Sequence, residues 1–252
     1  LALSWYEYDN ERISSVLERL FLMKNFARFL NHPDVSFSPI PDAIRVDNPA
    51  TGEALAFVRK TDSDGLKLLI QKAEVAQKLW AAKTALERAD VLWRWYFLIK
   101  ENKEELARIM TMEQGKSLTE ARGEIDYAAS FVRWFAEEVR RIDGDVLTSV
   151  KASRKLVVLK QPVGVTAAIT PWNFPSAMIA RKAAPALAVG CAMIVKPASL
   201  TPLSAYALVV LAYEAGVEQD LLPVVSGRAS EISHEFATNP TVRKISFTGS
   251  TE

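Results

Sequence analysis

Short, largely apolar runs alternate with longer helix-like segments between residues 165 and 248, and this alternation restricts the possible fold more than any other feature. Strands are expected at 165–169, 192–196, 222–226 and 244–248, and helices at 175–189, 202–215 and 230–238. Strands that are apolar throughout are typical of a parallel sheet buried between two layers of helices. Pro175 and Pro202 stand at helix starts, where proline is tolerated. The sequence therefore predicts an α/β fold with a parallel sheet and helices on both faces.

A helical region precedes this alternation. From Asp62 to Ile99, apolar residues recur three and four positions apart, as they do on one face of a helix. Further helices are expected at 104–112 and 118–141. The β-rich runs after Gly144 then predict two extended strands, which form a protruding β-hairpin at about 145–163.

The first 40 residues follow another pattern. The run VLERLFLMKNFARFL predicts an amphipathic helix, and NHPDVSFSPIP predicts a connector interrupted by prolines. We expect an N-terminal arm, 1–40, that packs on the rest of the protein. A membrane-surface helix is the alternative, which Glu18 and the mixed face disfavour.

The bulk composition excludes several classes of function. The formal net charge is +1, which lacks the cationic excess of a nucleic-acid binder. The longest apolar stretch, 183–195, is too short to cross a bilayer. The lone Cys191 has no disulfide partner, which fits a reducing compartment; we expect the cytoplasm, and an organelle interior would give the same pattern. His32 and His234 are isolated, so no metal site is expected.

Ligands of open α/β sheets bind beyond the carboxyl ends of the strands. The segments that follow the expected strands are TPWNFP (170–175), KPAS (196–199), SGR (226–228) and TGS (248–250). The usual dinucleotide fingerprint, G-x-G-x-x-G, is absent. Spacing alone therefore leaves a nucleotide site, a flavodoxin-like sheet and a purely structural sheet open.

Longer motifs carry a specific resemblance. The segments AAITPWNFPSAMIARKAAPALAVGCAMIVKPASLTP and VRKISFTGSTE resemble the aldehyde dehydrogenase superfamily, in particular its succinate-semialdehyde branch that uses NADP. The resemblance begins near VDNPATGE, continues through MTMEQGKSLTEARGEIDYAASFVRWFAEE and covers about four-fifths of the chain, although Ala184 stands where relatives commonly have glycine. It implies a Rossmann-like cofactor-binding domain, present in part at 41–252, after the N-terminal arm.

The resemblance implies a catalytic and a substrate-binding residue. Asn173 would donate its side-chain amide to the oxyanion that forms when a thiolate attacks the aldehyde, a task for a donor that does not titrate. The alternative is a helix N-cap. Arg181 would pair with the distal carboxylate of the substrate, because a guanidinium binds a carboxylate with two parallel hydrogen bonds. The alternative is a solvated helix arginine.

The resemblance also implies the cofactor-binding residues, which are Thr170, Pro171, Trp172, Lys196, Ala198, Ser199, Gly227, Gly249 and Ser250. Lys196 would reach the adenosine ribose. Ser199 stands where NAD-preferring relatives carry a glutamate that repels a 2′-phosphate, so we expect NADP, with NAD possible. Gly249 and Ser250 would let the backbone approach the pyrophosphate. Ser199 as a helix cap and Gly227 as an ordinary turn are the alternatives.

The family's cysteine nucleophile and its glutamate base both come after the FTGST motif, which here precedes the last residue, Glu252. Cys191 precedes Lys196 and lies in an apolar run, so we expect a buried structural thiol. The resemblance implies that the complete protein oxidises succinate semialdehyde, or a similar small carboxylated aldehyde, and forms homo-oligomers through the hairpin. A non-catalytic cofactor-binding fragment or pseudoenzyme, and an interaction module that uses the hairpin alone, remain alternatives.

Overall fold

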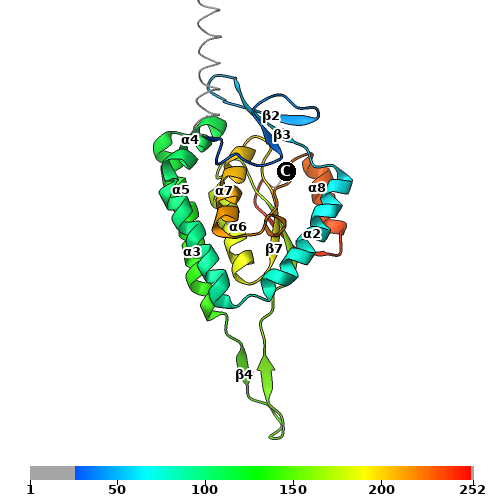
Figure 1. Ribbon diagram of the computed structural model, residues 1–252. Helices are drawn as coiled ribbons and strands as arrows, with labels where there is room; N and C mark the ends of the chain where they lie inside the picture. Colours follow the sequence, from blue (N-terminus) through cyan, green and yellow to red (C-terminus); the bar gives the residue numbers. More distant parts are fainter. Residues whose placement is uncertain (1–25, 251–252) are drawn as a thin grey trace, which may run out of the picture.

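The structure, a computed structural model, describes residues 26–250, and a parallel sheet lies at its centre (Figure 1). Its strands are β6 (Val165–Ile169), β7 (Ala192–Lys196) and β8 (Val242–Phe247), in the spatial order β7-β6-β8. The register sets Ile169 opposite both Lys196 and Phe247, so the three strands end level with one another. This confirms the predicted α/β fold, with strands 165–169 and 192–196 found at the expected residues.

The strand expected at 222–226 is wrong. Only Val224 pairs with β7, through an isolated parallel bridge to Val195. Pro223 has no N–H to donate, and Leu222 leaves the extended conformation with ψ near 57°. The Val195 amide donates to the Pro223 carbonyl at 2.8 Å and the Val225 amide donates to the Val195 carbonyl at 2.8 Å, where the pairing ends.

Helices cover the sheet and each other. Their bounds are α2 (Ser63–Ala81), α3 (Ala85–Glu101), α4 (Lys103–Gln114), α5 (Leu118–Glu138), α6 (Ala177–Ala188), α7 (Pro202–Ala215) and α8 (Ala229–Thr238), with 3₁₀ turns η1 (Val139–Arg141) and η2 (Gln219–Leu221). In Figure 1, α3, α4 and α5 form a layer on one side of the molecule, and α2 and α8 lie on the other side. The layer of α3, α4 and α5 packs on α6 and α7, which places it next to the loops at the carboxyl ends of the strands.

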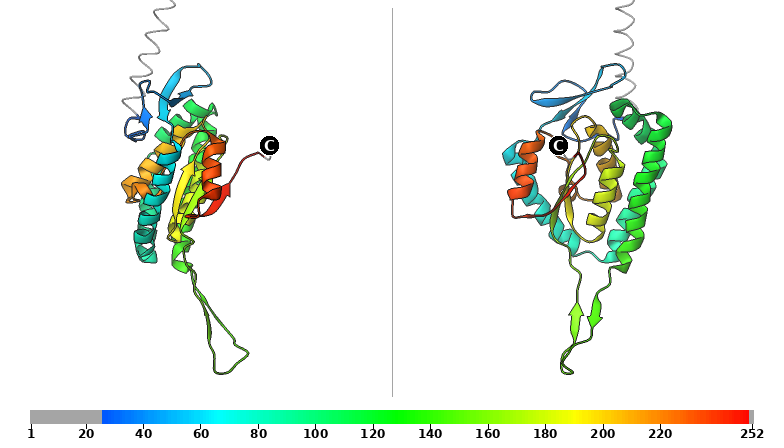
Figure 2. Two further views of the ribbon diagram at one scale, coloured as in Figure 1. Left: turned by 90° about the vertical axis from the view of Figure 1, so that its right-hand side faces the viewer. Right: turned by 180° about the vertical axis from the view of Figure 1, so that it is seen from behind.

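Two smaller sheets lie at opposite ends of the molecule (Figures 1 and 2). One has the order β1-β3-β2, with β1 (Val35–Ser36), β2 (Ala43–Asp47) and β3 (Ala54–Arg59), and was not predicted. The other is the predicted hairpin of β4 (Asp145–Leu147) and β5 (Leu156–Val158), which projects from the body. All six of its paired residues are exposed, five of them apolar.

Local sequence signals fix the helix starts. Thr84 and Ser117 each form a capping box, in which the hydroxyl accepts from the backbone of a glutamate three residues on and that glutamate accepts in return. Asp62 caps α2. The predicted apolar stripes of α2 and α3 are buried, with Trp80 and Trp95 at 2% exposure or less. Most of the N-terminal arm, 1–25, falls outside the described residues.

Candidate active site

Three loops meet at the carboxyl end of the central sheet. The Thr170 amide donates to the Lys196 carbonyl at 3.1 Å, and the Thr248 amide donates to the Ile169 carbonyl at 3.0 Å. These bonds continue the strand pairing for one residue and hold the segments after β6, β7 and β8 side by side. The resemblance assigns most of its site residues to these three segments, so the topology brings them to one edge of the sheet.

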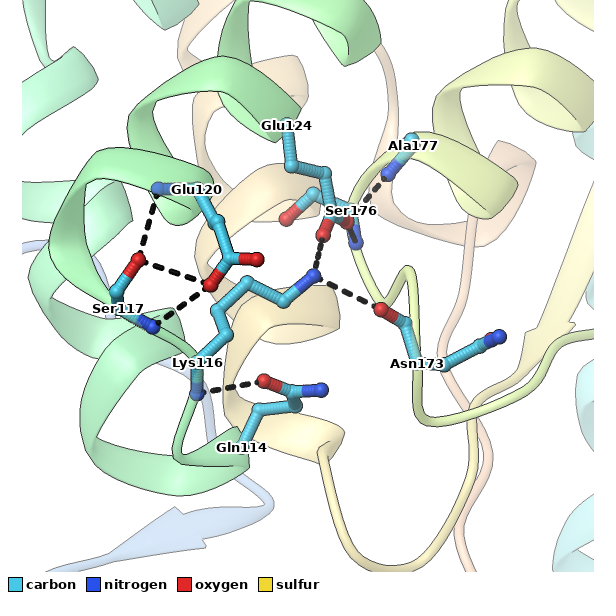
Figure 3. Close-up of polar contacts among 8 residues, drawn as sticks. All are labelled: Gln114, Lys116, Ser117, Glu120, Glu124, Asn173, Ser176 and Ala177. Atoms are coloured by element: carbon cyan, nitrogen blue, oxygen red, sulfur yellow. Dashed lines mark hydrogen bonds and ion pairs between the residues drawn. The ribbon is translucent and has the colours of Figure 1, made fainter.

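Asn173 is exposed in the loop between β6 and α6. The helix begins at Ala177 with Ser176 in the N-cap position, and Ser176 makes no side-chain cap bond. Instead, Glu124 of α5 accepts from the Ser176 amide at 2.9 Å and the Ala177 amide at 3.1 Å. The side-chain amide of Asn173 points away from this carboxylate (Figure 3). Asn173 is therefore not the cap of α6, and the alternative interpretation of this residue is wrong.

A lysine holds the same loop from the α4–α5 connection. The Nζ atom of Lys116 lies 2.5 Å from Glu124 Oε2 and donates to the Asn173 carbonyl at 2.8 Å (Figure 3). It also lies 4.6 Å from the centre of the Phe174 ring. The sequence analysis missed Lys116 and Glu124. A signal was present for Glu124, which interrupts the apolar stripe of α5 at a position where the neighbouring turns carry Ala121 and Ala128.

Helix α7, which follows the loop after β7, is capped in the same way as α6. Glu113 of α4 accepts from the Leu203 amide at 2.7 Å and from the Ser204 amide at 2.6 Å, at the start of α7. Burial raises the pKa of Glu113 to about 8, against the effect of these donors. Ser199 is exposed and takes no part in this cap, so the helix-cap alternative for Ser199 is wrong as well.

Lys196 lies at the end of β7 and is 4% exposed. Its Nζ donates to the Pro197 carbonyl at 2.9 Å, and burial lowers its pKa. Among residues 26–250, that is the one hydrogen bond the structure gives this ammonium, which can donate three. In the loops after β6 and β7, Thr170 Oγ1 and Thr201 Oγ1 are buried and have no hydrogen-bond partner in the described part of the chain.

These groups fit a dinucleotide with hydroxyl and phosphate groups, because unsatisfied buried donors at a loop cluster need partners from outside the chain. Gly227 contributes a tight backbone, with φ at +149° and a hypothetical Cβ only 3.4 Å from Ile232 Cδ1. The Thr61 amide donates to the carbonyl of the neighbouring residue, Ser226, at 2.7 Å. The other expected cofactor contacts lie at the loop surface: Pro171 and Ala198 half-buried, and Trp172, Gly249 and Ser250 exposed.

Arg181 lies on α6 and lines a cavity of about 640 Å³. Lys160, Lys182 and Lys244 line the same cavity, so its charged groups are all cationic. The Arg181 guanidinium stacks 5.7 Å from the centre of the Phe131 ring.

Asn173 is not among the residues that line this cavity. Within residues 26–250, Asn173 and Arg181 therefore do not share a cavity. Lys182 donates to Ser246 Oγ at 3.0 Å and to Thr248 Oγ1 at 2.7 Å. Burial and the neighbouring Arg181 lower the Lys182 pKa. Cys191 is buried in the wall of the cavity, as expected.

Comparison with known proteins identifies the family. Residues 38–252 match the model of the Aldehyde dehydrogenase family. The chain belongs to the aldehyde dehydrogenase family. It is 56% identical over 211 residues to succinate-semialdehyde dehydrogenase [NADP(+)] of Escherichia coli, and the match covers 84% of this chain and 44% of that protein. It is 55% identical over 209 residues to glutarate-semialdehyde dehydrogenase of Pseudomonas aeruginosa, with 83% and 43% covered.

A solved structure agrees with these relatives. The crystal structure of an aldehyde dehydrogenase from Brucella melitensis superposes with a TM-score of 0.82 at 56% identity, and the match covers 83% of this chain and 43% of that one. The resemblance to the aldehyde dehydrogenase superfamily and to its succinate-semialdehyde branch, predicted from the motifs, is thus confirmed. The chain spans less than half the length of these relatives. No helix within residues 26–250 is long and apolar enough to cross a membrane, and that range holds no cluster of three potential metal-ligating side chains.

Proposed function

We propose that the protein to which this chain belongs oxidises a small carboxylated aldehyde to its acid and reduces NADP⁺. The balanced reaction takes one aldehyde, one water and one NADP⁺ to one carboxylate, one NADPH and two protons. The observation that carries the proposal is the exposed, unengaged amide of Asn173, held at the carboxyl end of β6 beside the Lys196 loop. When bound, NADP⁺ accepts the hydride of the aldehyde carbon.

Asn173 is the catalytic residue that this chain contributes. Its side-chain N–H donates to the aldehyde oxygen and binds it more tightly once a thiolate has added to the carbon and the oxygen is anionic. The bond costs no protonation step, because an amide does not titrate in the physiological range. A donor that is already in place when the charge develops lowers the barrier, and removal of one such donor costs on the order of 10²- to 10³-fold in kcat.

The loops after the strands would hold the cofactor. Lys196 would donate to the adenosine ribose and its 2′-phosphate, and Ser199 would leave room for that phosphate without a repelling carboxylate. Thr170, Pro171, Trp172, Ala198 and Gly227 would form the walls, and Gly249 with Ser250 would bind the pyrophosphate. NAD would bind the same site more weakly, because it lacks the group that Lys196 attracts.

The substrate carries a second, distal anionic group. Arg181 binds that carboxylate, and the surrounding Lys160, Lys182 and Lys244 make the cavity positive. The named relatives act on succinate semialdehyde and on glutarate semialdehyde, which differ by one methylene between the aldehyde and the carboxylate. A site of this charge suits both substrates, and the length of the pocket selects between them.

The protruding hairpin joins this protein to a second copy of itself. Val146, Val157 and Leu159 are each more than 60% exposed, although they are apolar. A two-stranded ribbon with exposed backbone edges gains stability by adding to a neighbouring sheet. We assign 41–252 to the cofactor-binding part of the complete enzyme, after the arm at 1–40. On its own, such a part binds cofactor without catalysing the reaction.

Calorimetric titration of the 252-residue chain with NADP, and separately with NAD, tests this assignment. Ser199→Glu should weaken NADP binding by tenfold or more, because a carboxylate next to a phosphate costs about 1 to 4 kcal/mol at contact distance, and should leave NAD binding within about threefold. Ser153→Glu places the same charge on the exposed hairpin turn and should change neither affinity. Absence of NADP binding by the folded chain would refute the cofactor site.

A further inference from the structure

Lys116 stands in the short connection between α4 and α5, directly after Gly115, which ends α4 in the left-handed conformation with φ at +86°. The Lys116 amide donates to Gln114 Oε1 at 2.8 Å, which fixes the backbone from which its side chain leaves (Figure 3). That side chain is 12% exposed, and the side chain of Glu124 is 1% exposed. A cation and hydrogen-bond donors offset the cost of burying a carboxylate, and Lys116 supplies the cation for Glu124, so the two residues form one unit.

This unit holds the Asn173 loop at two places. Lys116 binds the carbonyl of Asn173, and Glu124 binds the amides of Ser176 and Ala177. The direction of the Asn173 carbonyl is set by the ψ torsion of Asn173 itself. A bond to that carbonyl therefore restrains the torsion next to the Cα from which the Asn173 side chain leaves.

The start of α7 provides a comparison within the same molecule. Glu113 caps α7 as Glu124 caps α6, through two backbone amides. No cation pairs with Glu113 among the described residues. Lys196 binds the Pro197 carbonyl in the preceding loop, but no ion pair joins this lysine to the capping glutamate. A buried glutamate is therefore enough to cap a helix in this fold. Of the two helix starts, only that of α6 has a lysine that binds both the capping glutamate and a loop carbonyl, so Lys116 does something that capping does not require.

We propose that Lys116 and Glu124 are positioning residues that hold the amide of Asn173 in the direction of the reacting carbonyl oxygen. The proposal rests on the oxyanion role of Asn173 set out above. An oxyanion donor acts only within a narrow range of distance and direction, so a loop that drifts by about 1 Å can lose on the order of 10²-fold in rate. Lys116 and Glu124 prevent that drift without touching the substrate.

A coupling measurement tests the proposal in an active enzyme, for which the chain is joined to the remaining part of the Escherichia coli relative. Lys116→Met should lower kcat at least tenfold and leave the KM for NADP within twofold. Lys116→Arg keeps donors for the Glu124 carboxylate and the Asn173 carbonyl, and should recover most of the rate. Because Lys116 acts through Asn173, Lys116→Met should cause no further loss in an Asn173→Ala background. Lys103→Met removes a comparable ion pair, between Lys103 of α4 and Asp126 of α5, and should change neither constant.

Amide hydrogen exchange in the 252-residue chain gives a second test that needs no activity. Lys116→Met should raise exchange at Ser176 and Ala177 at least tenfold and leave Leu203 and Ser204, which Glu113 caps, unchanged. An unchanged kcat, a loss that multiplies with that of Asn173→Ala, or unchanged exchange at Ser176 and Ala177 would overturn the proposal. Full activity of Asn173→Ala alone would instead refute the oxyanion role, and the exchange experiment would still decide whether Lys116 braces the loop.

Discussion

The contribution of Glu113 to the stability of this protein should fall as pH rises from 5 to 8. Glu113 is 3% exposed, and burial raises its pKa from 4.5 to about 8. In the unfolded chain the same carboxyl titrates near 4.5, so between the two values the folded state holds a proton that the unfolded state has released. A group with a raised pKa contributes its full stability below 4.5 and loses that contribution as pH rises through 8.

The magnitude follows from the shift. One pKa unit corresponds to about 1.4 kcal/mol, so three pH units remove up to about 4 kcal/mol of the free energy of unfolding. The amides of Leu203 and Ser204 favour the ionised form and are already included in the net shift. For a domain with ordinary stability, such a change is a large fraction of the total.

Urea unfolding of the chain and of Glu113→Gln at pH 5, 6, 7 and 8 measures this contribution. The difference between the two proteins should change by several kcal/mol over this range, because glutamine does not titrate. Glu105→Gln makes the same replacement on α4 at a half-buried position where no cap depends on it, and should leave the pH profile unchanged. A difference that stays constant from pH 5 to 8 would refute the raised pKa of Glu113.

Three further outcomes are expected. Burial lowers the pKa of Lys196, so NADP affinity should begin to decline at a pH below the ordinary lysine value of 10.5. Lys196→Met should bind NADP roughly tenfold more weakly and should not show this decline. Calorimetry from pH 7 to 10 measures both effects, and an unchanged affinity of the variant would contradict the role of Lys196. Trp80→Phe leaves the Leu187 carbonyl without its 2.8 Å donor and should cost about 1 to 3 kcal/mol in urea unfolding, whereas a cost below about 0.5 kcal/mol would contradict the bond. Val157→Asp on the hairpin should abolish self-association in sedimentation while the melting temperature stays within a few degrees, and an unchanged sedimenting mass would contradict the proposed interface.

The central sheet could be predicted because its signals are local. β6 and β7 are apolar except for Thr166 and Lys196, and they are bounded by proline, glycine or polar loops. α7 begins at Pro202 and ends before Gly216. The strand around Val224 could not be predicted correctly, since its composition is strand-like but the proline inside it limits the pairing. The sheet of β1, β2 and β3 was missed, because its strands are short and few of their residues are buried: none in β1, one in β2 and three in β3.

The same distinction between local and long-range signals applies to the candidate site. The loops after the strands follow from topology, and the motifs assign residues to them. The glutamates that cap α6 and α7 act across 52 and 90 residues of sequence, respectively, so no short-range pattern reveals their partners. Their positions in otherwise apolar helical stripes, where Leu106, Ile109 and Met110 precede Glu113, were the available sign that each was buried for a reason.

The two capping glutamates make the helical layer inseparable from the sheet. A chain that began at Asp145 would keep β6, β7 and β8 and both crossover helices, yet it would lose Glu113 and Glu124 together. The four backbone amides that these glutamates bind, at the buried starts of α6 and α7, would then lack hydrogen-bond acceptors. The smallest piece of this chain that keeps the sheet and both helix starts intact is therefore larger than its strands suggest, and any exchange of this sheet between relatives must include α4 and α5.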